Sequence, residues 1–295
     1  MADAVTRQPV FVLGHARSGT TLVQRVLNSY DDVLIWGEHA GVLRDVAAAW
    51  HRAATSEQFF RDARPLAEVL RDSDPTASWQ AWMTWVQPES WTTLVRTFVE
   101  GLFLPDGLPG KRVWGFKEVR YRGEPADPTF ALLRHLYPEA LWVFVVRHPL
   151  EVMASQRRTP FGPRTLAELR ENVATWCARY DAYRTLAEQP DVRAVWVRYD
   201  DLVGPCDDLQ ALVRELGRAL GPPQRRVLEA EGGRGSSFTH EDPTNPTGPT
   251  ERWRILPRAW IGLIDARTRT LCDTLGLDRR DVGALERLLG RLTGG

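Results

Sequence analysis

One segment near the N-terminus most constrains the fold that this chain can adopt. It consists of a short apolar stretch, a glycine-bearing turn and an amphipathic helix. Residues 9–13 (PVFVL) are too few for a helix and rich in β-branched and aromatic side chains, which predicts a strand buried on both faces. Gly14 ends this strand, and apolar residues then recur at helical spacing up to about Leu27, with Ser18 placed to cap the first turn. Such a loop aims backbone N–H groups and the positive end of a helix dipole at one point. The segment therefore predicts an anion site, for phosphate or sulfate.

The turn departs from the Walker A phosphate loop at one position. Gly14 and Gly19 have its G-x-x-x-x-G spacing. Thr21 can stand for its Ser/Thr, but Thr20 occupies the lysine position, so an ordinary ATP or GTP site would lack its β/γ-phosphate cation. A cation lies instead inside the loop, at Arg17. The alternative is a strand–turn–helix corner whose glycines serve packing alone.

This loop resembles that of the sulfotransferases that use 3'-phosphoadenosine 5'-phosphosulfate (PAPS). Their 5'-phosphosulfate loop reads [K/R]-S-G-T-T, and the matching residues here are Arg17, Ser18, Gly19, Thr20 and Thr21. The arginine form occurs in tyrosylprotein and many bacterial sulfotransferases. The resemblance implies PAPS as the donor, adenosine 3',5'-bisphosphate as the product, and these five residues as donor-binding residues.

The rest of the chain alternates short apolar segments with helical patterns. Further strands are expected at 33–36, 113–117, 141–146 and 192–197. This alternation predicts an α/β fold in one domain over 1–295: a P-loop-like, doubly wound, mostly parallel sheet of about five strands with flanking helices. Side chains just beyond the carboxyl ends of such strands converge, and they are Arg17, Glu38, Lys117, Arg147 and Tyr199.

Two segments interrupt the alternation. Residues 40–104 are helical in pattern without a strand signal, which predicts a helical insertion that caps the acceptor side of the sheet. Trp79, Trp82 and Trp85 recur there as on one helix face, either as core packing or as an apolar wall for the acceptor. Residues 231–256 include a stretch dense in Gly, Pro, Ser and Thr, which predicts a mobile loop over the nucleotide, with a disordered linker as the alternative.

Arg147 follows the 141–146 segment, where a Walker B motif would place an acidic residue for Mg²⁺. An arginine there can bind a phosphate bidentately, and Ser155 can add a hydroxyl from the following helix. The resemblance implies that this R-x7-S pair binds the 3'-phosphate of PAPS. A structural arginine at a strand end is the alternative. Arg147 and Thr20 both count against the competing interpretation, a P-loop phosphotransferase (kinase) that uses ATP and Mg²⁺.

Sulfonate transfer places growing negative charge on the phosphate leaving group, where cations and N–H dipoles are needed and no metal is required. Arg17 and Lys117 are the candidates for this role, and Lys117 resembles a lysine of the tyrosylprotein enzymes. A hydroxyl acceptor also needs a base. Glu38 resembles the catalytic glutamate of the same enzymes, and the adjacent His39 is the alternative base.

Two further positions are assigned through the resemblance. Tyr199 begins a segment similar to the Y-E-x-L segment near the nucleotide, although a buried aromatic is an equal alternative. Arg252 belongs to a segment similar to the one that closes over the nucleotide. The R-K-G-x-x-G-x-x-K signature of the cytosolic enzymes is absent from this chain.

The composition limits the classes of binding partner that are expected for this protein. Basic and acidic residues balance at 38 each, which gives no electrostatic case for nucleic acid or an anionic membrane. The three cysteines are widely spaced, so neither a metal site nor a disulfide framework is indicated. No segment resembles a signal peptide or a membrane span, which predicts a cytoplasmic protein acting on a small-molecule acceptor. The identity of that acceptor and the oligomeric state stay open, as does a nucleotide-binding protein without catalysis.

Overall fold

The computed structural model describes residues 7–76, 78–105, 108–121, 127–232 and 252–293. Its centre is one five-stranded sheet in the order β2-β5-β1-β6-β7, and every neighbouring pair in it is parallel. The strands are β1 (Gln8–Gly14), β2 (Val33–Trp36), β5 (Val113–Glu118), β6 (Leu141–Val146) and β7 (Arg193–Arg198). The expected α/β fold with a mostly parallel sheet of about five strands is confirmed.

The two faces of this sheet have different side chains because successive residues of a strand point to opposite sides. One face is aromatic: Phe11 stacks on Phe116 with ring centroids 4.9 Å apart and meets Trp142 edge-on at 5.2 Å. The other face is aliphatic and includes Val12 and Val143. In β1 and β6 the residues of both faces are almost completely buried, which explains the continuous apolar runs of these two strands.

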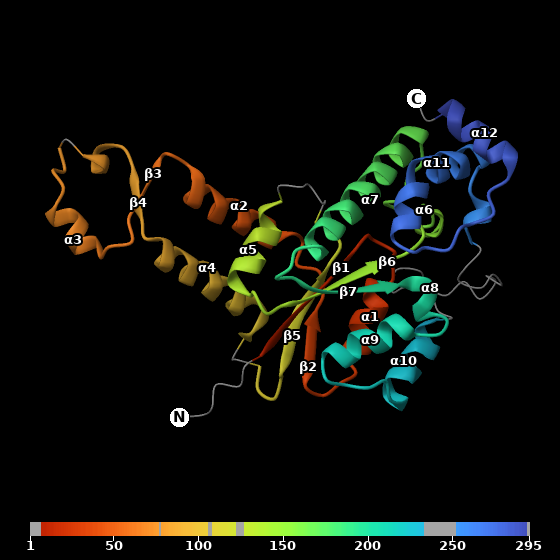
Figure 1. Ribbon diagram of the computed structural model, residues 1–295, viewed down its shortest axis with the longest axis horizontal. Coiled ribbons are helices and arrows are strands. Elements are labelled where there is room, and N and C mark those ends of the chain that lie inside the picture. The colour runs from red at the N-terminus through yellow and green to blue at the C-terminus, as the bar shows by residue number, and fades with distance from the viewer. Residues whose placement is uncertain (1–6, 77, 106–107, 122–126, 233–251, 294–295) are drawn as a thin grey trace.

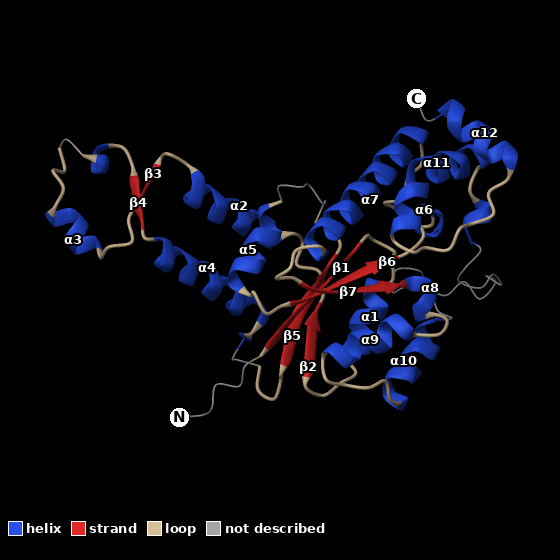
Figure 2. Ribbon diagram, viewed as in Figure 1, coloured by secondary structure: helices blue, strands red, loops and turns tan. Residues whose placement is uncertain are grey.

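Helices cover both faces, as Figures 1 and 2 show. The aliphatic face packs against α1 (Thr20–Leu27), α9 (Asp207–Glu215) and α10 (Pro222–Gly232). The aromatic face packs against α5 (Pro128–Leu136), α6 (Pro149–Arg157), α7 (Leu166–Ala187) and α11 (Arg258–Thr274). The short α8 (Tyr199–Leu202) follows β7, and α12 (Ala284–Thr293) packs on α11. Because β1 lies between β5 and β6, the strand order reverses beside it, where doubly wound sheets bind ligands.

Between β2 and β5 the chain forms an arm that extends away from the sheet (Figure 1). Its helices α2 (Val42–Thr55) and α4 (Pro88–Phe103) lie side by side and carry β3 (Phe59–Arg61), α3 (Leu66–Arg71) and β4 (Thr84–Val86). The expectation of an insertion without strands was wrong, because β3 and β4 pair in parallel. Strands of three residues are too short for alternation to be recognised in a sequence.

The expected tryptophan stripe of one helix was also wrong. Trp79 lies in the 3-10 helix Trp79–Ala81 and stacks on Phe60 at 4.6 Å, whereas Trp85 lies in β4. Trp82, between them, is 79% exposed. Spacing over seven residues cannot distinguish a helix from a turn that leads into a strand.

The predicted loop at 231–256 falls largely on residues 233–251, outside the described part of the chain. On its C-terminal side, the 3-10 helix Arg252–Ile255 contains Trp253, which is buried in the aromatic-side core. Among the described helices, none combines the length and the apolar character that crossing a membrane requires.

Candidate active site at the carboxyl ends of the strands

The predicted anion site is the loop between β1 and α1. Arg17 and Gly19 have φ angles of 76° and 99°. Gly19 is required here, because a Cβ would lie 2.5 Å from the ring of Tyr199. The predicted cap was wrong: Gly19 precedes α1 without a side-chain cap, and the Ser18 hydroxyl instead lies 2.9 Å from the Tyr180 hydroxyl. The first N–H groups of α1 therefore have no capping side chain, which suits them to an anionic ligand.

Tyr180, on α7, supports this loop from the aromatic side of the sheet. Its buried hydroxyl donates to the carbonyl of Val145 at 2.8 Å and accepts the N–H of His15 at 3.2 Å. One phenol thus joins β6 to the anion loop. Sequence reasoning missed this role, because Tyr180 belongs to a long helical pattern far along the chain.

The two predicted phosphate-binding elements come together. Arg17 Nε donates to Ser155 Oγ at 3.0 Å, and Arg147 Nη1 donates to the Arg17 carbonyl at 3.4 Å. The Arg147 guanidinium lies over the ring of Tyr199, 3.9 Å from its centroid, and 3.7 Å from a carboxylate oxygen of Glu151. Arg147 and Ser155 are each 6% exposed. Four of the predicted residues therefore form one cationic corner beside β1, in which Arg147 and Ser155 are buried and Arg17 and Tyr199 are half-buried.

The predicted base and lysine form a second group, beyond β2 and β5. Lys117 Nζ lies 2.5 Å from one carboxylate oxygen of Glu38, and Arg120 Nη1 lies 2.6 Å from the other. Burial raises the pKa of Glu38, but the hydrogen bonds and charges of Lys117 and Arg120 outweigh burial and hold this pKa below its ordinary value. The carboxylate is 30% exposed and keeps access to solvent. Arg120 was not singled out in the sequence.

A buried carboxylate, that of Glu118, ties the loops after β2 and β5 together. One of its oxygens accepts the N–H groups of His39 and Gly41, both at 3.3 Å. The other accepts the N–H groups of Val119 at 2.8 Å and Arg120 at 3.0 Å. Its position at the end of a buried strand was the available signal, but the sequence does not reveal which loop it holds.

His39, the alternative base, points into the protein. Its side chain is 7% exposed, its Nε2 lies 2.9 Å from the Tyr121 hydroxyl, and its ring meets Phe116 edge-on at 4.9 Å. Burial lowers the pKa of His39 and so favours the neutral ring. The imidazole is therefore part of the aromatic core, whereas the Glu38 carboxylate is not.

The two groups are neighbours in the sheet, since β1 pairs with β5 and places Val12 opposite Lys117. Thr20 and Thr21 begin α1 next to the loop. Arg252 begins a 3-10 helix, but its side chain lies outside the described part of the structure. Among the described residues, no three His, Cys, Asp or Glu side chains come together as metal ligands.

One comparison with known proteins gives the family, and a second gives the fold. A family model described as "Sulfotransferase family" matches residues 9–226. The sulfotransferase domain of the Synechococcus PCC 7002 olefin synthase superposes with a TM-score of 0.57 at 18% identity, covering 94% of this chain and 98% of that one, which shows a shared fold.

Two other solved structures are less similar. A sulfotransferase from Alicyclobacillus acidocaldarius has a TM-score of 0.45 at 16% identity, covering 96% of this chain and all (100%) of its own. Mouse sulfotransferase SULT7A1 complexed with PAP has a TM-score of 0.43 at 11% identity, covering 97% and 88%. A search of the curated proteins finds no match.

Proposed function

The chain belongs to the sulfotransferase family, and from this premise we propose that it transfers a sulfonate group from PAPS to a hydroxyl of a small intracellular metabolite. The contact between Arg17 and Ser155, 3.0 Å long, carries the proposal. It joins the loop suited to the 5'-phosphosulfate to the arginine–serine pair suited to the 3'-phosphate. A 3'-phosphate distinguishes PAPS from ATP, so a site with both elements would select this donor.

In the proposed reaction the acceptor oxygen bonds to sulfur as the bond from sulfur to the phosphate oxygen breaks. Arg17, Lys117 and the first N–H groups of α1 stabilise the charge that grows on the leaving phosphate. Glu38 takes the proton of the acceptor hydroxyl. Adenosine 3',5'-bisphosphate and the sulfated acceptor leave as products.

The exposed fractions of the two side chains support Glu38 rather than His39 as the base. The Glu38 side chain is 30% exposed, whereas the His39 side chain is 7% exposed and packs among aromatic rings. Lys117, paired with Glu38, lies on the strand next to the anion loop. We infer that this lysine turns to the sulfonate when the donor binds, which frees the Glu38 carboxylate for the acceptor.

The donor assignment is tested by thermal unfolding with nucleotides. Adenosine 3',5'-bisphosphate should raise the melting temperature without added metal, because a ligand that binds only the native state stabilises it. ATP with Mg²⁺ should do much less. Equal protection by both, or protection that needs Mg²⁺, would favour the phosphotransferase. Turnover of labelled PAPS with an extract of small metabolites would exclude a non-catalytic binding protein.

A further inference from the structure

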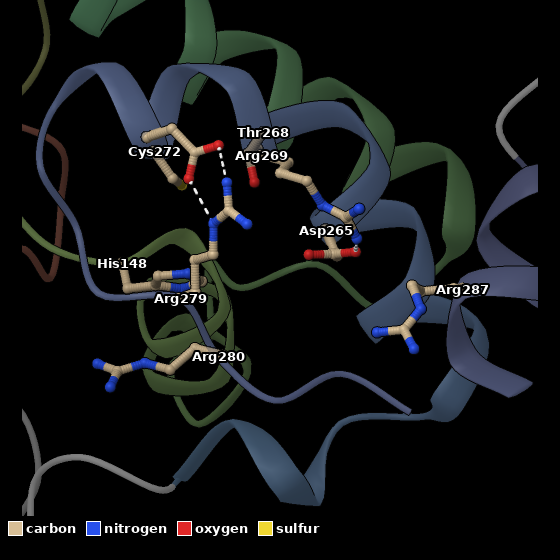
Figure 3. A pocket seen from close by; sticks show the side chains of 9 residues that line it. His148, Asp265, Thr268, Arg269, Cys272, Arg279, Arg280 and Arg287 are labelled. Carbon is tan, nitrogen blue, oxygen red and sulfur yellow. Dashed lines mark hydrogen bonds and ion pairs between the residues drawn. The ribbon is translucent and has the colours of Figure 1, made fainter. Parts of the chain in front are cut away.

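A polar cavity of about 180 Å³ lies between the first turn of α6 and the C-terminal half of α11 (Figure 3). Its lining includes four arginines, two aspartates and His148. This volume is several times the ~30 Å³ that one water molecule occupies in the liquid. The cavity can therefore hold a small polar ligand.

Both aspartates of the lining already have partners. Asp265 pairs with Arg269, one turn further along α11. Asp273 pairs with Arg279 at 2.9 Å. The carboxylates are thus occupied by two of the four arginines, and they leave little acceptor capacity for a cationic ligand.

The other two arginines give the lining a net positive charge. Arg280 pairs with Asp200, a residue outside the lining, at 2.6 Å. Arg287 donates to the carbonyl of Val282, which is neutral. Four guanidinium groups face three paired carboxylates, with Asp200 included, so one net positive charge remains and makes the cavity attractive to an anion.

His148 supplies a hydrogen-bond donor of fixed direction. Its Nδ1 accepts the N–H of Leu150 at 3.3 Å, so the ring proton is on Nε2. The residue is only 6% exposed, lines the cavity, and its Nε2 makes no hydrogen bond to any described residue. Burial and the charge of Arg280 lower the pKa of His148 to about 3, which keeps the ring neutral. An N–H on a side chain that lines an arginine-rich cavity, with no hydrogen bond to another described residue, matches an anionic oxygen.

We propose that this cavity binds a tetrahedral oxyanion, either a free sulfate or phosphate ion or the phosphate group of a larger molecule. The site is distinct from the proposed donor site. The Arg147 guanidinium packs on Tyr199, whereas the next side chain, His148, turns to α11. Two anion sites thus flank the first turn of α6, one on each side.

The test is a calorimetric titration of the full chain with sodium sulfate, inorganic phosphate and glycerol 3-phosphate, at an ionic strength held constant with chloride. Binding of the monoester assigns the cavity to a phosphate group of a larger molecule. Binding of the inorganic ions alone assigns it to a free ion. No binding of any of the three overturns the proposal. In Arg17→Ala the affinity for the titrated anion should persist. Loss of that affinity would assign the ion to the donor loop and overturn the proposal. This result does not depend on which reaction the enzyme catalyses.

Three variants locate the binding. His148→Asn keeps an N-cap acceptor for Leu150 but removes the ring N–H, and should weaken sulfate about tenfold. Arg287→Ala removes an exposed cation and should weaken it about threefold. Arg258→Ala, which breaks an α11 ion pair with Glu286 outside the cavity lining, should leave the affinity unchanged. Unchanged affinity in His148→Asn and Arg287→Ala would overturn the proposal, and Arg287→Ala serves alone if the first variant does not fold.

Discussion

The loop after β1 and the loop after β2 both follow strands of one parallel sheet, but they are held in different ways. Both contain residues at positive φ, Arg17 and Gly19 in the first and Ala40 and Gly41 in the second, and Tyr180 supports the first from α7. The predicted anion-binding groups of the first, however, belong to its own consecutive residues. The second is held from outside, because the Glu118 carboxylate binds its N–H groups and Lys117 fixes Glu38. The predicted anion loop thus depends on adjacent residues, whereas the Glu38 carboxylate is positioned by Lys117 and Arg120, on and just after β5.

The largest expected effect separates the two loops by function. Glu38→Gln keeps the size of the side chain and removes its basicity, so kcat should fall about 10² to 10⁴-fold. The affinity for adenosine 3',5'-bisphosphate should stay nearly unchanged, since the described contacts of Glu38 are with Lys117 and Arg120. Steady-state kinetics and calorimetry measure the two quantities. A parallel loss of nucleotide affinity would contradict the assignment.

The matched control for this variant is His39→Gln, at the neighbouring position. It should retain most of kcat and lower the melting temperature, because the His39 ring packs in the aromatic core. A fully active Glu38→Gln beside an inactive His39→Gln would reverse the assignment of the base.

The next effect concerns Arg147, which follows β6 and donates to the Arg17 carbonyl in the loop after β1. Arg147→Ala should weaken adenosine 3',5'-bisphosphate by about 2 to 4 kcal/mol, a factor of about 30 to 1,000, if the contact is a buried bidentate one. Calorimetry gives the dissociation constant. Arg157→Ala, on the same helix but stacked on Trp260 at 5.0 Å, should leave that constant unchanged. Equal effects of the two substitutions would indicate general disruption of α6.

The difference between the two loops also explains which features could be predicted from the sequence. The sheet was predictable, because its strands are apolar runs between helical patterns. The strand, turn and helix over residues 8–27 were predictable, because their residues are contiguous. Glu118 and Tyr180 were not, since their roles depend on the pairing of β2 with β5 and on the packing of α7 against β6. The Ser18 cap failed for a related reason: Tyr180 competes for its hydroxyl from a distant helix.

Glu118→Gln tests the external support of the loop after β2. A carboxylate accepts N–H groups at both oxygens, but an amide has only one acceptor, so two of the four bonded N–H groups would face an NH₂ group. We expect kcat to fall about tenfold to a hundredfold, because small displacements of a catalytic group are costly. The donor affinity should be retained. Asp208→Asn, which disturbs an Arg198 pair near β7, should lower stability without this loss of kcat.

The smallest effect concerns how Arg120 tunes the base. A general base must be ionised, so activity on the acid side falls as Glu38 takes up a proton. Burial raises the pKa of Glu38, and Lys117 and Arg120 together bring it below the ordinary value. Arg120→Gln removes one of these charges, so the pKa should rise and the acid limb of the kcat/KM profile should move to higher pH.

The size of the shift in the acid limb measures how strongly the pKa of Glu38 depends on Arg120. Arg120 is 50% exposed, so solvent and salt screen its charge, and the displacement should shrink as ionic strength increases. Activity on the neutral plateau should change little, which separates a change in pKa from a loss of structure. An acid limb that stays in place, or moves to lower pH, would mean that Glu38 is not the group that titrates. A limb that moves upward and returns with salt would show that a side chain outside the loop after β2 tunes the base.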